Sequence, residues 1–192
     1  SCTLITDKNN NQINGFHPAA MGFPCEYAFP HPDASADWGI VSPGNLDDMK
    51  ALPRLFREKG IRYIYDPGQQ IPALSGDDLL DAITGSALLV TNDYELEMIS
   101  KATQRTRAEL RALTGGVITT LGEQGSVIDN GERGSVGIAA PKTVADPTGA
   151  GDSFRSGLLK GLLHGLDVHA ILQHERCCRV AQLVRGVFRG IE

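Results

Sequence analysis

Asp146-Pro147-Thr148-Gly149-Ala150-Gly151-Asp152-Ser153-Phe154 is the stretch that decides how this chain is interpreted. It follows a broken, strand-like segment at 136–144 and precedes a segment at 153–166 that is typical of a helix. The first amides of a helix have no partner inside the helix, and the helix dipole adds partial positive charge at the same end. A Gly-Ala-Gly turn at the mouth of a helix therefore predicts an anion site suited to phosphate.

Asp152 lies just inside this predicted helix. A carboxylate has no reason to bind the anion beside it, but it is well placed to accept a proton from a group that attacks that anion. The stretch therefore indicates phosphoryl transfer. The alternative is a glycine-rich strand-to-helix turn whose aspartate only favours the first helical turn.

The run from Asp146 to Asp152 resembles the second signature of the PfkB, or ribokinase-like, carbohydrate and nucleoside kinases, with its Asp-x-Thr-Gly-Ala-Gly-Asp core. The resemblance implies that Asp152 is the catalytic base and that the amides of Gly149, Ala150 and Gly151 form the anion hole. It also implies ATP as phosphate donor, Mg²⁺ beside the phosphates and, as in some relatives, a monovalent cation such as K⁺ near Asp146. Agreement over the whole run favours this interpretation over a plain turn.

Composition is that of an ordinary globular protein. The 192 residues suit one domain, or one with a small extension, and 41% are hydrophobic while 21% are charged. A net charge of −5 gives no electrostatic reason to expect nucleic acid or an anionic membrane as partner. The apolar runs are too short for a membrane span, no signal peptide is recognised, and the four cysteines lack metal-ligand spacing. We therefore expect a cytoplasmic protein.

Predicted strands alternate with predicted helices from residue 38 onward, which indicates a parallel sheet with helices on both faces. The strands are expected at 38–42, 61–65, 87–90 and 117–121, and the helices at 46–59, 76–83, 93–101 and 105–113. Pro53 is expected to kink or break the first helix. A hairpin of residues 126–129 and 135–138, joined through Asn130-Gly131, follows, and the last two helices are expected to begin near Ala150 and Asp167.

Together with the resemblance, this order predicts a ribokinase-like three-layer α/β/α fold with a mostly parallel central sheet. Residues 1–37 are expected to stand apart, because the apolar-rich runs 2–6 and 12–16 flank a polar turn and predict a hairpin. The resemblance implies that these strands are remnants of a small β lid over the substrate, followed by a loop, and that residues 38–192 form the nucleotide-binding and catalytic core. The family's first glycine-rich signature has no counterpart here, which predicts an N-terminally truncated member.

Asn92 and Glu95 follow a predicted buried strand and open a helix. Taken alone, the pair is a good capping box, in which the asparagine caps the helix and the glutamate reaches back. The resemblance implies that an Asn-x-x-Glu at this place helps to position Mg²⁺ and phosphate through water, and both roles can hold together.

Thr120, Gly122 and Gly125 form a Thr-x-Gly-x-x-Gly pattern at the end of a predicted strand. By itself the pattern indicates a β-turn that uses glycine for positive φ. The resemblance implies that the threonine and the glycine backbone lie against the nucleotide. All these segments would then lie beyond the carboxyl ends of parallel strands, where open α/β sheets bind ligands.

The resemblance implies an ATP-dependent kinase that transfers the γ-phosphate to a hydroxyl of a sugar or nucleoside. Two segments, 66–70 and Phe154-Arg155, favour the nucleoside, adenosine-kinase-like branch, although 66–70 is equally well explained as a plain turn. The arginines of the last predicted helix are a solvated face or a subunit contact in a homodimer. The competing hypothesis is a non-catalytic nucleotide-binding module, or a fragment whose substrate pocket a partner completes.

Overall fold

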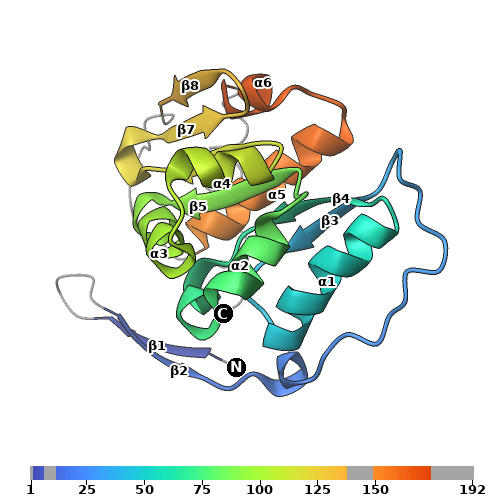
Figure 1. Cartoon of the computed structure of the whole chain (residues 1–192). Helices are drawn as coiled ribbons and strands as arrows, with labels where there is room; N and C mark the ends of the chain where they lie inside the picture. The colour runs from blue at the N-terminus through green and yellow to red at the C-terminus, as the bar shows by residue number, and fades with distance from the viewer. Residues whose placement is uncertain (1, 7–11, 138–148, 174–192) are drawn as a thin grey trace, which may run out of the picture.

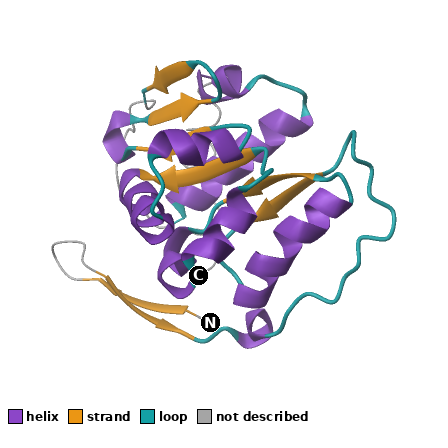
Figure 2. Cartoon of the chain, viewed as in Figure 1, coloured by secondary structure: helices purple, strands orange, loops and turns teal. Residues whose placement is uncertain are grey.

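The computed structural model describes residues 2–6, 12–137 and 149–173. Its centre is a six-stranded sheet with helices on both faces (Figures 1 and 2). The strands follow the order β3-β4-β5-β6-β7-β8; β3 to β6 are parallel, and β7 and β8 are antiparallel. They span Trp38–Val41, Arg62–Tyr65, Leu88–Asn92, Val117–Thr120, Ser126–Asp129 and Arg133–Val136. The predicted three-layer α/β/α fold with a mostly parallel sheet is confirmed.

Six α-helices of the described residues form the two outer layers. Helices α1 to α4 share one hydrophobic core with the sheet, and α5 and α6 share a second core with its other face. The helices span Leu46–Glu58, Gly76–Ile83, Asp93–Thr103, Arg107–Leu113, Ala150–Leu163 and Val168–Gln173. Their order and approximate bounds agree with the sequence predictions.

The middle strands are apolar on both faces because both faces are covered. In β4, Tyr63 and Tyr65 belong to the core under α1 to α4, whereas Ile64 points into the core under α5. In β5, Leu89 faces the first core and Val90 the second. This alternation follows from the two-residue period of a strand.

The sequence predicts a kink or a break at Pro53, and the break is wrong, because α1 is continuous there. The helix begins after Asn45, whose side chain accepts from the amides of Asp47 and Asp48 at 2.9 and 3.3 Å, and runs through Pro53 to Glu58. Pro53 lies on the buried face with Met49 and Phe56. Packing of this face offsets the one hydrogen bond that a proline removes from a helix interior.

The hairpin of β7 and β8 also differs from its prediction. Asp129 pairs with Arg133, so the connection consists of residues 130–132 and β8 begins two residues earlier than expected. Gly131 has a φ of +110°, which suits glycine within this longer turn. The rest of the strand-like segment expected at 136–144 lies mainly outside the described residues.

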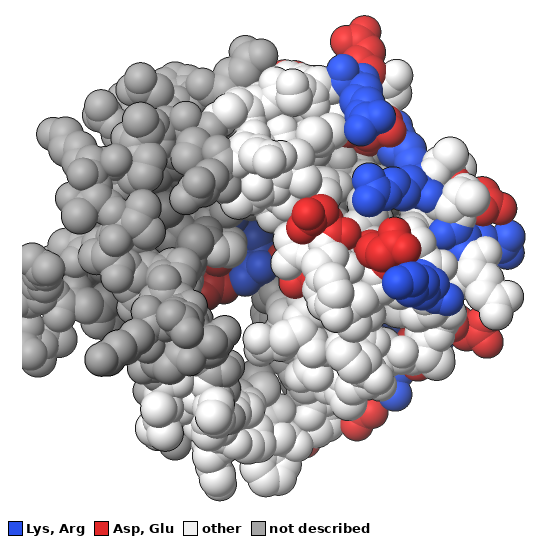
Figure 3. Space-filling model, turned by 90° about the vertical axis from the view of Figure 1, so that its left-hand side faces the viewer, with Lys and Arg blue, Asp and Glu red and all other residues white. Residues whose placement is uncertain are grey.

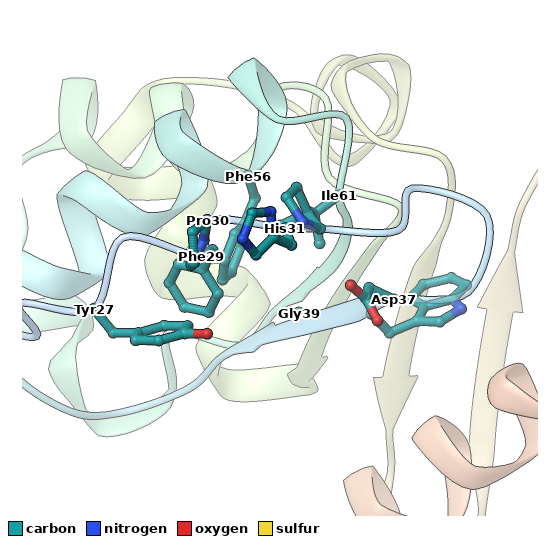
Figure 4. Close-up of a pocket in the computed structure, with 10 residues that line it drawn as sticks. Tyr27, Phe29, Pro30, His31, Asp37, Gly39, Phe56 and Ile61 are labelled. Atoms are coloured by element: carbon teal, nitrogen blue, oxygen red, sulfur yellow. The ribbon is translucent and has the colours of Figure 1, made fainter.

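Residues 2–6 and 12–16 form β1 (Cys2–Thr6) and β2 (Gln12–Phe16), a separate antiparallel ribbon, as predicted. The ribbon projects from the body in Figure 1, and the following segment returns to β3 as the expected loop, with one short 3₁₀ turn at Ala19–Gly22. Phe29 of this loop packs edge-on against Phe56 of α1, with ring centroids 5.4 Å apart. A cavity of about 320 Å³ lies between the loop, β3 and α1 (Figure 4).

Candidate active site

The carboxyl ends of the parallel strands bring the predicted site segments to one edge of the sheet. Asn92, the last residue of β5, is paired in register with Thr120, the last residue of β6. Asp66 directly follows β4, and its amide donates to the carbonyl of Val41 at the end of β3 over 2.9 Å. Open α/β sheets bind their ligands at this edge.

The amino-terminus of α5 has the geometry of an anion site. Gly149 is the N-cap and has a φ of +78°, in the left-handed region that glycine enters without a Cβ penalty. Its carbonyl accepts from the amide of Ser153 at 2.9 Å, and among the described residues no side chain caps the helix. The amides of Ala150, Gly151 and Asp152 therefore point out of the helix without an intrahelical acceptor. A fourteen-residue helix dipole is aligned behind them.

Asp152 lies in the first turn of α5 with its side chain 78% exposed. Its Oδ1 accepts a hydrogen bond from Nη2 of Arg155, three residues further along the helix. Nη1 of the same guanidinium donates to Oδ2 of Asp66, the buried carboxylate at the end of β4. One arginine thus bridges an exposed and a buried carboxylate.

Burial raises the pKa of Asp66 above its ordinary value, and the Arg155 guanidinium opposes that shift. The charges of Glu95 and Asp152 add to the raised pKa, so all three carboxylates belong to one electrostatic neighbourhood. Burial favours the neutral form of Arg155, but the carboxylates of Asp66 and Asp152 outweigh it and hold the pKa of Arg155 above its ordinary value. Arg155 is therefore cationic at every physiological pH.

Asn92 and Glu95 form the capping box that the sequence predicts. Asn92 Oδ1 accepts from the amide of Glu95 at 2.7 Å, and Glu95 Oε2 accepts from the amide of Asn92 at 2.8 Å. Within the described part of the chain, no group of three or more Asp, Glu, His or Cys side chains could hold a metal ion by itself. The amide of Asn92 and the carboxylate of Glu95 fit Mg²⁺, which needs only one or two carboxylates when nucleotide phosphates supply its other ligands.

The loop after β6 is shaped by its two glycines. Gly122 and Gly125 have φ values of +57° and +88° around a short 3₁₀ turn, and the amide of Leu121 donates to the carbonyl of Gly125 at 2.7 Å. A Cβ on Gly125 would lie 2.0 Å from the carbonyl oxygen of Val136 in β8. Thr120 Oγ1 donates to the carbonyl of Thr91 at 3.4 Å. The predicted glycine turn is therefore present, and it is packed against the neighbouring hairpin.

The ion pairs of Arg155 with Asp66 and Asp152 are the feature that sequence reasoning missed. The segments 66–70 and 154–155 each favour the nucleoside branch in the sequence, but no local pattern indicates that they touch. In segment 66–70, the buried Asp66 is followed by a 3₁₀ helix at Gly68–Ala73. Asp146 and the arginines of the last predicted helix lie outside the described residues.

The surface around the described residues carries both signs of charge. On the face of Figure 3, basic and acidic side chains are interspersed over the described part, in keeping with the net charge of −5. Among the described residues, none of the helices combines the length and apolar character that a bilayer crossing requires.

The sequence as a whole matches a known family. The pfkB family carbohydrate kinase model matches residues 2–188. A nucleoside kinase of Methanocaldococcus jannaschii is 30% identical over 168 residues, which are 86% of this chain and 54% of that protein. A nucleoside kinase of Methanothermobacter thermautotrophicus is 28% identical over 167 residues, 86% of this chain and 54% of that protein. The chain spans about half the length of these curated relatives.

Solved structures agree with the sequence match. A Burkholderia thailandensis nucleoside kinase in complex with inosine superimposes with a TM-score of 0.84 at 30% identity, covering 95% of this chain and 59% of that one. The Methanocaldococcus jannaschii nucleoside kinase, described as an archaeal member of the ribokinase family, gives a TM-score of 0.75 at 26% identity, covering 93% and 57%. The chain belongs to the pfkB carbohydrate kinase family, whose nucleoside and sugar kinases are phosphotransferases with hydroxyl acceptors.

Proposed function

We propose that this chain carries the nucleotide-binding and catalytic part, residues 38–192, of an ATP-dependent kinase that phosphorylates a hydroxyl of a nucleoside. The observation that supports it best is the amino-terminus of α5, where uncapped amides and the exposed carboxylate of Asp152 lie side by side. Amides aimed at a phosphate and a base next to it are the two elements that a phosphoryl transfer requires.

Asp152 acts as the base. The acceptor oxygen attacks the γ-phosphorus of ATP, its hydroxyl proton passes to the carboxylate of Asp152, and the bond from the γ-phosphorus to the bridging oxygen breaks as ADP leaves. The amides of Gly149, Ala150 and Gly151 hold the charge that spreads over the transferring group. Their fixed place at the helix terminus means that little reorganisation is needed during the reaction.

Glu95 and Asn92 would hold Mg²⁺ through water, and Glu95 would keep its place in the capping box. When bound, Mg²⁺ supplies positive charge beside the β- and γ-phosphates. The carboxylate of Glu95 belongs to the same electrostatic neighbourhood as Asp66 and Asp152, which supports a cation at this place. A K⁺ ion near Asp146 stays a further part of the proposal.

The nucleotide lies against the loop that contains Thr120, Gly122 and Gly125. This loop follows β6, the strand that pairs with Asn92, and among the described residues no atom lies within 4 Å of the place that a Cβ on Gly122 would take. A backbone without Cβ atoms allows a flat base to approach closely.

A nucleoside is favoured over a sugar as acceptor for two reasons. The Methanocaldococcus and Methanothermobacter relatives are nucleoside kinases, and the Burkholderia protein is described in complex with inosine and with ADP-inosine. The segments 66–70 and 154–155, which favour that branch in the sequence, meet in the ion pair of Asp66 and Arg155. A sugar stays the alternative acceptor.

A second candidate function is nucleotide binding without catalysis. The chain spans about half the length of its curated relatives. If another segment or a partner chain completes the substrate pocket, this chain by itself would bind nucleotide without catalysing transfer.

A coupled ADP-release assay with Mg-ATP, against a panel of nucleosides, pentoses and hexoses, tests the proposal. We expect substrate-dependent turnover, which Asp152→Asn lowers by about 10²–10⁴-fold because a positioned base is lost. Asp77→Asn removes the same charge from the first turn of α2 and is expected to leave turnover unchanged. An unchanged rate for Asp152→Asn would exclude that residue as the base, and ATP binding by calorimetry without any turnover would favour the second function.

A cytoplasmic location and a homodimer complete the proposal. Cys25 is a free, exposed thiol, which suits a reducing compartment. Ile5, Ile13 and Phe16 of the β1–β2 ribbon have exposed side chains, and apolar side chains of this kind favour association with a second surface.

A further inference from the structure

The two ion pairs of Arg155 join the buried carboxylate of Asp66 to the exposed carboxylate of Asp152. The Asp66 side chain is 5% exposed, Arg155 is 19% exposed and Asp152 is 78% exposed. Asp66 and Arg155 lie 89 positions apart in the sequence, so their contact ties β4 to α5. Asp66 is the buried end of this arrangement, and the exposed end, Asp152, is the proposed base.

Asp66 fixes the guanidinium. Its own backbone is held by the hydrogen bond to Val41, and Gly68, with a φ of +45°, packs so closely that a Cβ there would lie 3.3 Å from Asp66 Oδ1. A buried carboxylate needs a partner charge in good geometry. The guanidinium is a planar fork whose donors keep fixed directions. An orientation imposed by Asp66 at Nη1 is therefore passed to Nη2, which contacts Asp152.

An exposed ion pair between residues three apart on a helix would by itself do little to hold Asp152, because solvent screens it and both side chains keep rotamer freedom. The link to a buried carboxylate removes that freedom from Arg155. We infer that Arg155 is a positioning residue that, anchored on Asp66, holds Asp152 in its working orientation. Oδ1 of Asp152 takes the hydrogen bond from Arg155 and leaves Oδ2 to accept the proton of the substrate hydroxyl; this step rests on the proposed kinase function.

Three variants separate positioning from stability. Arg155→Met leaves the buried Asp66 without a partner, so we expect it to lower both the melting temperature and kcat. Adding Asp66→Asn removes the unpaired charge, and the double variant Asp66→Asn/Arg155→Met is expected to recover much of the melting temperature. Its kcat should stay about 10-fold or more below wild type, with the KM for ATP little changed, because a misplaced base slows the chemical step.

Arg57→Met is the matched control for the loss of an arginine ion pair. Arg57 is 27% exposed and pairs with Asp81 at 2.9 Å between α1 and α2. It is expected to lower the melting temperature while leaving kcat at the wild-type value. If kcat of Asp66→Asn/Arg155→Met returns to wild type together with its melting temperature, Arg155 is only structural and the inference is overturned.

Crystal structures of wild type and the double variant give a readout that needs no turnover. We expect Asp152 in a single rotamer against Arg155 in the wild type, and in other rotamers in the double variant. The same single rotamer in both would overturn the inference. An absence of turnover in the wild type would count against the proposed kinase function alone, because the pair of structures still tests the positioning of Asp152.

Discussion

Gly149 connects backbone conformation to chemistry at the scale of a single residue. Its φ of +78° turns the chain so that the next amides open toward the proposed anion site, and no atom of the described residues lies within 4 Å of the place that a Cβ would take. Strain, and not a clash, is therefore the effect of a side chain at this position. An L-residue in the left-handed region is less stable by roughly 1–2 kcal/mol.

Gly149→Ala is expected to lower the free energy of unfolding by about 1–2 kcal/mol and to lower kcat by about 10–100-fold, because small displacements of the amides misplace the phosphate. Gly165→Ala is the matched control. Gly165 follows the other end of α5 and has a φ of +69°, and no atom of the described part of the chain lies within 4 Å of the place that its Cβ would take. Urea denaturation should show similar losses for both variants, and equal kcat values would contradict a role of Gly149 in the anion site.

At the scale of elements, three helices begin with the same capping motif. Ser75 with Asp78 caps α2, Asn92 with Glu95 caps α3, and Thr106 with Glu109 caps α4, each as a complete capping box. The box explains local helix formation in all three cases. Only the box of α3 lies beside Thr120 and in the charge neighbourhood of Asp66, so only there do we propose a second role.

Glu95→Gln should leave the cap nearly intact, because glutamine also serves in a capping box. We expect it to raise the Mg²⁺ concentration for half-maximal activity several-fold, since one of the few carboxylates near the phosphates is lost. A Mg²⁺ titration of the coupled assay measures this. Glu109→Gln makes the same change in the capping box of α4 and should leave the Mg²⁺ titration unaltered. Identical titration curves for wild type, Glu95→Gln and Glu109→Gln would show that Glu95 acts only as a helix cap.

The whole molecule is stabilised by two cores, one on each face of the sheet. Leu79 of α2 lies in the first and Leu158 of α5 in the second, and both side chains are 0% exposed. Only the second core supports α5, the helix whose amino-terminus is the proposed anion site. Buried apolar side chains stabilise both helix layers, but only the layer of α5 and α6 holds the helix that carries the proposed base.

Leu79→Ala and Leu158→Ala should each destabilise the fold by about 2–5 kcal/mol, the range for a buried leucine truncated to alanine. Leu158→Ala is expected to lower kcat as well, because α5 can shift over the cavity that the substitution leaves. Chemical denaturation gives the first quantity, and kcat at a temperature where both variants are folded gives the second. A lower kcat for Leu79→Ala alone would contradict this division between the layers.

The sequence by itself determined the elements and the proposed anion site. Free amides at a helix start, a capping box and the two-residue period of a strand depend on neighbours within a few positions. The run from Gly149 to Asp152 therefore predicts a helix start with free amides. The alternation of strands and helices predicts the mostly parallel sheet.

Only the tertiary structure decided how distant segments act on each other. Packing of Met49 and Phe56 carries α1 through Pro53, and pairing of Asp129 with Arg133 sets the register of the last hairpin. The ion pair of Asp66 with Arg155 exists only because the fold brings the end of β4 and the first turns of α5 together. A charge pair 89 positions apart leaves no periodicity or local motif in the sequence, because its energy arises from burial that the folded chain alone creates.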